Sequence, residues 1–212
     1  SENTASRRAQ YDANAFGTGI GGLVFDGDDT YNITNESNIN VGGTWPEKSF
    51  AAVFRTGTDT SGFQIVYEQG GSIRGYQISI DDGNIYAAGF NNTGSEWGSD
   101  RFKIMNLGAV QANTTYRVIM VFDANTGLGS IKANLNGGTF VQLDEVGAQP
   151  AHSGNIGIGS EQGGTVRPTT LALTNNTDVN FFKGAIGQIM LWNTALDDTQ
   201  VRAVDSYLTH KW

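Results

Sequence analysis

The chain of 212 residues contains no cysteine, three prolines and two histidines. The absence of cysteine excludes disulfide bonds, thiolate metal sites and a cysteine nucleophile. Animal extracellular domains often carry disulfides, so a glycine-rich chain without cysteine favours export from a Gram-negative-type bacterium. We therefore expect an extracellular or cell-surface location. No apolar run approaches the roughly 20 residues of a membrane span, so no membrane insertion is expected.

Basic side chains are scarce, because 13 Lys and Arg residues stand against 21 Asp and Glu residues, for a formal net charge of -8. A protein that binds a phosphate backbone needs a cluster of Lys and Arg, so a nucleic acid is not an expected partner. The charge is compatible with a neutral glycan, a cationic partner, or calcium held between carboxylates.

Long helical periodicity is absent from most of the chain. Instead, short runs of β-forming residues are separated by turns of Gly, Asn, Asp and Thr, as in a sandwich or barrel. The clearest runs are Leu23–Asp26, Ser49–Arg55, Phe63–Tyr67, Tyr76–Ile80, Asn84–Ala88, Tyr116–Phe122, Ser130–Leu135, Asn155–Gly159 and Ala185–Trp192. Asp82-Gly83 and Asn136-Gly137 are hairpin signals. The pattern predicts an all-β, two-sheet antiparallel sandwich over residues 23–212, preceded by residues 1–22 as an arm or linker with a first edge segment.

One short helix is expected at the C-terminal end of the sequence. Asp197 is a helix cap, and Gln200, three residues later, completes a capping box. Val201, Val204 and Leu208 then fall on one face of the helix, which would pack against the sandwich.

Several stretches, in this order and spacing, resemble the laminin G-like domains of the concanavalin A-like lectin/glucanase superfamily. They are Leu23-Val-Phe-Asp-Gly-Asp-Asp-Thr-Tyr31, Tyr67-Glu-Gln-Gly-Gly71, Gly75–Ile80, Asp82–Tyr86, Tyr116–Phe122, Leu135-Asn-Gly137, Phe182-Lys-Gly-Ala-Ile186, Leu191-Trp-Asn193 and Ala195-Leu-Asp-Asp198. The resemblance implies a jelly-roll sandwich, often with one calcium ion. Members are mostly binding modules of large bacterial adhesins or polysaccharide-active enzymes. The family usually has an acidic residue after its closing Gly-x-Ile motif, but Gly187-Gln188 stands here, so no metal ligand is expected there.

No catalytic site is visible in the residue pattern. Glycanases of this fold place two carboxylates on one strand face in the pattern Glu-x-Asp-x-Glu, which does not occur in this sequence. His152 and His210 stand outside any motif with a nucleophile. We therefore predict no catalytic residue and a protein that binds rather than cuts. A polysaccharide lyase or hydrolase whose site is assembled only in space is the alternative.

Three aspartates at a glycine turn, Asp26, Asp28 and Asp29, are the predicted metal ligands. Calcium prefers several carboxylate and carbonyl oxygens in a flexible loop. The same residues are equally typical of turns in which Asp side chains accept hydrogen bonds from nearby backbone amides. Asp81 and Asp82 form a second acidic pair that is open to both interpretations.

One seven-residue sequence motif, the repeated motif, occurs twice, as Glu68–Arg74 and as Glu161–Arg167. Each copy reads Glu-Gln-Gly-Gly, a hydroxyl residue, a β-branched residue and Arg. Paired glycines allow the backbone to turn sharply and to approach a ligand closely. The predicted ligand-binding side chains of a shared polar rim are Glu68, Gln69, Arg74, Glu161, Gln162 and Arg167. The alternative is that each Glu pairs with an Arg and braces its own loop.

Sugar sites combine an exposed aromatic ring with polar hydrogen-bonding groups. Trp97, within the polar stretch Asn91–Asp100, is the predicted ring, and Trp45 is the second candidate. A ring tucked against the sandwich as a loop anchor is an equal alternative.

These observations predict an extracellular, calcium-assisted ligand-binding module, directed at carbohydrate, in a bacterial adhesin or a polysaccharide-degrading enzyme. The expected partner is a glycan or peptide on a cell surface or polymer, and the expected state is a monomer within a larger multidomain chain. A calcium-dependent peptide-binding adhesin domain is one alternative, because Arg74 or Arg167 could hold a terminal carboxylate. A structural spacer is another, favoured if the loop residues are buried and mutually paired.

Overall fold

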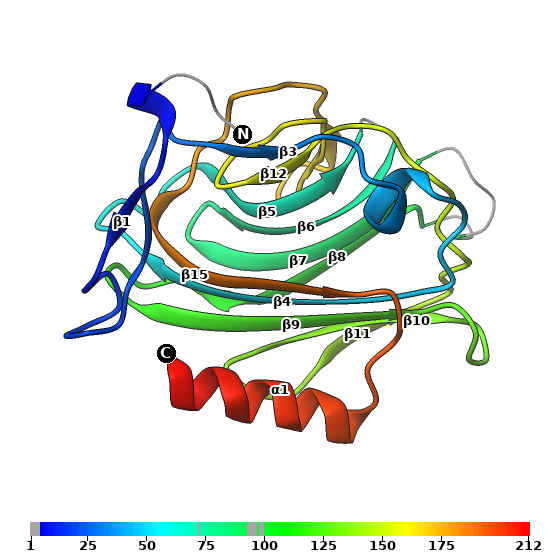
Figure 1. Cartoon of the computed structure of the whole chain (residues 1–212). Helices are drawn as coiled ribbons and strands as arrows, with labels where there is room; N and C mark the ends of the chain where they lie inside the picture. The colour runs from blue at the N-terminus through cyan, green and yellow to red at the C-terminus, as the bar shows by residue number, and fades with distance from the viewer. Residues whose placement is uncertain (1–4, 72, 93–96, 98–99) are drawn as a thin grey trace.

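The structure is a computed structural model that describes residues 5–71, 73–92, 97 and 100–212. Two antiparallel sheets face each other across one core (Figure 1). The seven-stranded sheet has the order β1 (Gln10–Asp12), β2 (Gly22–Asp26), β15 (Lys183–Trp192), β4 (Glu47–Thr56), β9 (Thr115–Asp123), β10 (Ser130–Leu135) and β11 (Val141–Asp144). The six-stranded sheet has the order β3 (Tyr31–Ile33), β12 (Ile156–Ile158), β5 (Phe63–Gly70), β6 (Arg74–Asp81), β7 (Asn84–Asn91) and β8 (Phe102–Ala109). The other described elements are the hairpin β13 (Val166–Arg167)–β14 (Ala172–Leu173), the 3-10 turn Ala5–Arg7, the π-helix Ser37–Val41 and α1 (Asp198–Lys211).

The predicted all-β jelly-roll sandwich with a short C-terminal helix is therefore confirmed. Its core lies between the sheets because successive side chains of a strand point to opposite faces. Phe50 and Phe54 of β4 point toward the six-stranded sheet, and Tyr76 and Ile78 of β6 point back toward them. The Phe50 and Tyr76 ring centroids are 5.1 Å apart. Burial of each large side chain contributes about 1.5–3 kcal/mol, so this layer holds the two sheets together.

The two predicted hairpin turns lie where the sequence places them. Asp82 and Gly83 join β6 to β7 with φ angles of 44° and 79°. Asn136 and Gly137 begin the turn between β10 and β11 with φ angles of 53° and 71°. Positive φ at both positions is the backbone of a primed turn, which Asn, Asp and Gly tolerate.

The predicted helix is also confirmed. Asp197 caps α1, and the reciprocal hydrogen bonds between Asp197 and Gln200 complete the capping box. Val201 and Leu208 are buried against the seven-stranded sheet, with Val204 packed beside them. Among the described residues, no helix combines the length and the apolar character that crossing a membrane requires.

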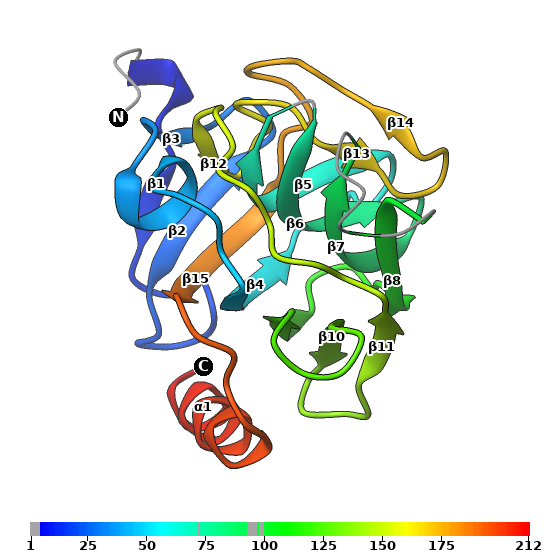
Figure 2. The ribbon, with the colours of Figure 1, turned by 90° about the vertical axis from the view of Figure 1, so that its right-hand side faces the viewer.

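Both outer faces of the sandwich are partly covered. α1 lies against the seven-stranded sheet, where its apolar face contacts a cluster that includes Ile119 and Val121 of β9 (Figure 1). On the opposite side, the β13–β14 hairpin lies over the six-stranded sheet (Figure 2), and Val166 packs with Phe90 of β7.

Residues before β2 pack on the sandwich. The strand β1 pairs with β2 at the sheet edge, and the ring of Phe16 lies 4.8 Å from that of Trp212, centroid to centroid. The division of the chain at residue 23 stays a prediction.

Candidate functional site

The two copies of the repeated motif, Glu68–Arg74 and Glu161–Arg167, contact each other on the outer side of the six-stranded sheet. Oε1 of Glu68, on β5, accepts a hydrogen bond of 2.9 Å from the backbone N–H of Gln162. Glu161 accepts hydrogen bonds from the backbone N–H of Asn176 at 3.0 Å and from Nδ2 of Asn180 at 2.6 Å. The side chains of Glu68, Glu161 and Gln162 are all buried. Through Glu161, the second copy therefore holds the backbone at residues 176–180 in place.

The glutamines of the two copies, Gln69 and Gln162, also lie in the protein interior. Gln69 is buried, and its Oε1 accepts a hydrogen bond of 2.7 Å from the hydroxyl of Tyr67. Gln162, at the matching position of the second copy, donates through Nε2 to Asp178 at 2.6 Å and to Thr30 at 2.8 Å. The open polar rim expected of these glutamates and glutamines is not present, because each is buried and hydrogen-bonded to protein atoms, as the spacer alternative predicts. The bracing alternative fails in its predicted form, because the described contacts pair neither glutamate with an arginine.

The glycines of the motif explain how the two copies come so close. Gly70 has a φ of 154°, and a Cβ atom at Gly163 would lie against the Gly70 carbonyl oxygen and the backbone of Gly154. Only a residue without a side chain fits between these backbones. The paired glycines thus serve packing within the protein. Ser72 of the first copy lies outside the described residues.

The two arginines of the motif do not converge. Arg167 forms an ion pair with the buried Asp81, with Nη2 to Oδ1 at 3.0 Å, and also contacts Asp82 at 3.4 Å. Arg74 instead donates from Nε to Oδ1 of Asn91 at 3.0 Å. Because Arg74 begins β6 and Asp81 ends it, the two arginines act about 23 Å apart, at roughly 3.3 Å per residue. Asp81 and Asp82 are therefore ion-pair partners of Arg167, and one small ligand does not reach both arginines.

The predicted sugar-binding tryptophan is buried. Trp97 is 0% exposed, its Nε1 donates to the carbonyl of Gly147 at 2.9 Å, and its ring stacks on Phe122 at 5.8 Å between centroids. The expectation of an exposed ring is wrong, because the sandwich holds Trp97 as a loop anchor. Trp45 is half-buried with Nζ of Lys48 located 3.9 Å from its ring centroid. Residues 93–96 and 98–99 of the Trp97 loop lie outside the described residues.

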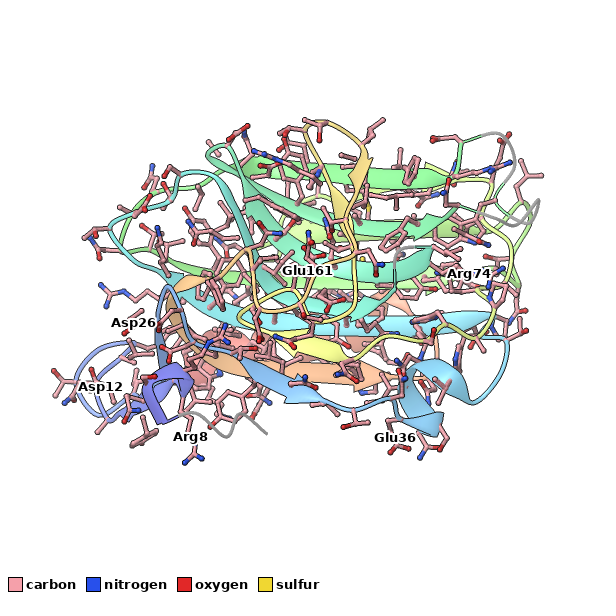
Figure 3. All side chains as sticks on the ribbon, turned by 90° about the horizontal axis from the view of Figure 1, so that it is seen from above. Arg8, Asp12, Asp26, Glu36, Arg74 and Glu161 are labelled. Atoms are coloured by element: carbon pink, nitrogen blue, oxygen red, sulfur yellow. The ribbon has the colours of Figure 1, made fainter. Side chains whose placement is uncertain are left out.

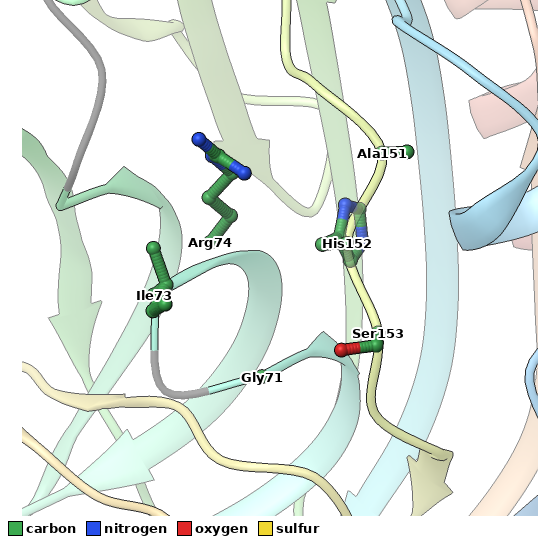
Figure 4. Close-up of a pocket in the computed structure, with 6 residues that line it drawn as sticks. All are labelled: Gly71, Ile73, Arg74, Ala151, His152 and Ser153. Carbon is green, nitrogen blue, oxygen red and sulfur yellow. The ribbon is translucent and has the colours of Figure 1, made fainter.

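A small cavity opens where the turn between β5 and β6 meets residues 151–153 (Figure 4). It encloses about 130 Å³ and is lined by Gly71, Ile73, Arg74, Ala151, His152 and Ser153. Figure 4 shows Arg74 on one side of the cavity and His152 and Ser153 on the facing segment. Among the described residues, this cavity is lined by one predicted ligand-binding side chain, that of Arg74.

His152 forms the buried wall of this cavity. Burial lowers the pKa of His152 to about 4, and the nearby positive charges of Lys48 and Arg74 act in the same direction. The ring is therefore neutral near pH 7, and its Nε2 lies 3.4 Å from Nε2 of Gln69. Arg74 consequently supplies the positive charge among the residues that line the cavity.

The predicted metal ligands come together at the turn after β2. One oxygen from each of Asp26, Asp28 and Asp29 lies within 4.8 Å of the other two. A side-chain hydrogen bond with Asp26 raises the pKa of Asp28, and burial raises that of Asp29. The backbone N–H of Asp26 also donates to Asp29 at 2.9 Å. Three close carboxylates fit a calcium ion, and the hydrogen bond fits the turn interpretation equally well.

The acidic turn and the arginine cavity are separate places. Figure 3 shows Asp26 and Arg74 at opposite sides of the molecule. An ion held by the acidic turn would therefore not bridge to a ligand at Arg74.

No protein-family model and no curated protein matches the chain. Solved structures do resemble it. The CBM40 domain of the Ruminococcus gnavus IT-sialidase, bound to α2,3-sialyllactose, is 16% identical over 87% of this chain and 95% of its own, with a TM-score of 0.57. The botulinum neurotoxin serotype D binding domain is 13% identical over 95% of this chain and 46% of its own, with a TM-score of 0.62. Domains LG4–5 of the mouse laminin α1 chain are 13% identical over 89% of this chain and 44% of their own, with a TM-score of 0.57.

These similarities show the fold alone, because the identities are low. The shared fold is a two-sheet antiparallel jelly-roll sandwich.

Proposed function

We propose that this chain is a carbohydrate-binding module and that its ligand contacts the cavity at Arg74. The observation that carries the proposal is a guanidinium group held at an open cavity beside a serine hydroxyl and an exposed aliphatic side chain. The CBM40 domain of similar fold is bound to α2,3-sialyllactose. That complex supports carbohydrate as the ligand class, and the lack of a carboxylate pair among the described residues of the cavity lining supports binding over hydrolysis.

The cavity suits a sugar that carries a carboxylate. Asn91 holds Nε of Arg74, which orients the guanidinium group for a charge-assisted hydrogen bond to a carboxylate. Ser153 adds a hydroxyl, and Ile73, 44% exposed, offers an apolar surface to the sugar ring. The six described lining residues include no Phe, Tyr or Trp, so we expect weak binding at a single site.

A glycan array tests this proposal with Arg74→Ala. We expect the variant to bind acidic glycans about tenfold more weakly or worse, because a hydrogen bond to a charged group contributes roughly 1.5–3 kcal/mol. Arg8→Ala is the matched control, since Arg8 is exposed and lies on the other side of the molecule from Arg74 (Figure 3). Binding of no glycan by the wild-type protein, or equal binding by both variants, would sink the proposal.

Calcium at the acidic turn is a second part of the proposal. Asp26, Asp28 and Asp29 would hold the ion, which would stabilise the turn by offsetting the repulsion between three carboxylates. Added calcium is expected to raise the melting temperature of the wild-type protein, and Asp28→Asn is expected to remove most of that rise. The control is Asp144→Asn, at an exposed aspartate of β11. A wild-type melting temperature that calcium and chelator leave unchanged would exclude the ion.

The setting that we propose is an exported adhesin or polysaccharide-degrading enzyme at a bacterial cell surface. The cavity at Arg74 would also accept the terminal carboxylate of a peptide, which is the second candidate ligand. A peptide-display screen with the same Arg74→Ala variant separates a peptide ligand from a glycan.

A further inference from the structure

A second pocket lies under the C-terminal helix, far along the chain from the repeated motif. It encloses about 320 Å³, within the range of small-molecule sites. Its lining residues come from β10, from the turn after β10 and from α1: Asn134, Gly137, Gly138, Phe140, Asp198, Val201, Arg202, Asp205 and Ser206. The pocket shares no lining residue with the cavity at Arg74.

The floor of this pocket carries a polar group without a partner. Asn134 is 4% exposed, and no described residue donates a hydrogen bond to its Oδ1. A buried acceptor that stays unpaired costs about 1–3 kcal/mol. Its neighbours in sequence, Ala133 and Leu135, contact the main core, so the strand alternation directs Asn134 toward the helix side of the sheet. A hydroxyl that enters the pocket is the donor that would satisfy Oδ1.

The walls combine an apolar surface with balanced charges. Phe140 and Val201 are the large apolar groups. Asp205 is paired with Arg117 at 3.0 Å, and Asp198 is paired with Lys132 at 3.0 Å. Because each carboxylate already has a cationic partner, the pocket offers hydrogen-bond acceptors without strong net charge. The guanidinium group of Arg202 and the hydroxyl of Ser206 add donors.

We propose that this pocket binds one neutral pyranose residue. Hydroxyl donors of the sugar would reach Asn134 and Asp205, while the apolar face of the ring lies on Phe140. A neutral sugar fits better than an ammonium ligand, because both carboxylates already have cationic partners. This proposal rests on the proposed carbohydrate-binding function. It differs in the residues that form the site and in the charge of the sugar, which is neutral here and acidic at Arg74.

Titration of ¹⁵N-labelled protein with the methyl pyranosides of glucose, galactose and mannose tests the proposal by NMR. We expect saturable shifts of the Asn134 side-chain amide and of the Gly137 and Gly138 backbone amides for at least one sugar. Asn134→Leu is expected to weaken that binding about tenfold, the value of one lost hydrogen bond in a desolvated site. Gln142→Leu, at an exposed amide on the neighbouring β11, is the matched control and should bind as the wild type does.

A second variant guards against a folding defect at the buried position. Ser206 is exposed on α1, so Ser206→Trp should fill the pocket while it leaves the melting temperature unchanged. The proposal is overturned if no pyranoside shifts the pocket resonances, or if both variants bind like the wild type. If no sugar shifts the resonances of the pocket, but glycan binding on the array is lost in Arg74→Ala, this inference alone is overturned. If a sugar shifts the resonances of the pocket, but Arg74→Ala still binds glycans on the array as the wild type does, the proposed site at Arg74 alone is overturned.

Discussion

Glu68 is a carboxyl group inside the protein, and its protonation links stability to pH. Burial raises the pKa of Glu68 well above its ordinary value of 4.5, and the nearby Glu161 acts in the same direction. The backbone N–H of Gln162 opposes this shift and does not outweigh it. The folded protein therefore keeps the proton on Glu68 at pH values where the unfolded chain has already released it.

The variant Glu68→Gln should respond to pH differently from the wild type. The stabilisation from a protonated Glu68 is complete below pH 4.5, the ordinary pKa, and is lost as the pH rises toward the raised pKa of the folded state. In that window the wild type should lose up to about 1.4 kcal/mol per pH unit relative to the variant. Urea unfolding of both proteins at several pH values from 4.5 upward measures the difference.

The comparison with the variant separates the effect of Glu68 from that of His152, because both proteins carry His152. The pKa of His152 is lowered from 6.5 to about 4, so its contribution to stability is lost only as the pH falls between these values. Glu145→Gln, at an exposed glutamate, is the control and should follow the wild type. Parallel curves for the wild type and Glu68→Gln would mean that Glu68 is ionised in the folded protein.

The sequence shows which candidate residues have suitable chemistry, but it does not show whether their side chains are exposed to solvent. Glu68 and Trp97 stand in polar stretches, which suggests surface positions. The groups that cover them lie far along the chain: Gln162 is 94 residues from Glu68, and Gly147 is 50 residues from Trp97. The missed pocket at Asn134 has the same origin, since its lining joins β10 to the helix. An unpaired amide in a strand next to an Asn-Gly turn gave no local signal.

At the scale of elements, α1 depends on local chemistry at its first turn. The carboxylate of Asp197 accepts hydrogen bonds from the backbone N–H groups of Thr199 at 2.8 Å and Gln200 at 2.9 Å, and Oε1 of Gln200 accepts one from the backbone N–H of Asp197 at 2.9 Å. These bonds satisfy N–H groups that have no partner within the helix.

Asp197→Ala should lower the free energy of unfolding by about 1 kcal/mol, because the first turn of α1 loses its cap. Chemical denaturation followed by tryptophan fluorescence measures the change. Thr209→Ala, which removes a hydroxyl near the other end of the helix, should have a smaller effect. If the two variants lose equal stability, the capping box does not hold the helix in place.

Elements with strong local signals were predictable, and those with mixed patterns were not. The hairpin at Asp82 and the capping box at Asp197 follow from residues that favour those turns wherever they occur. The strand β8 was missed because the buried Lys103 interrupts its apolar alternation beside Ile104 and Met105. The two-residue strands β13 and β14 are too short to give a periodic pattern.

At the scale of the whole molecule, the possible binding places are far apart. The acidic turn and the Arg74 cavity lie on opposite sides in Figure 3. The third place lies between α1 and the seven-stranded sheet. Calcium would therefore act on stability, and each sugar site would act independently of it.

The hairpin β13–β14 and the helix α1 each lie over one outer face of the sandwich. A long polysaccharide laid flat against the protein would meet these elements before it met either sheet. If the chain binds carbohydrate as proposed, this coverage would favour a chain terminus or a short branch presented end-on. Affinity for a polymer would then rise with the number of its free ends and not with its length, and tight attachment to a surface would come from several copies of the module acting together.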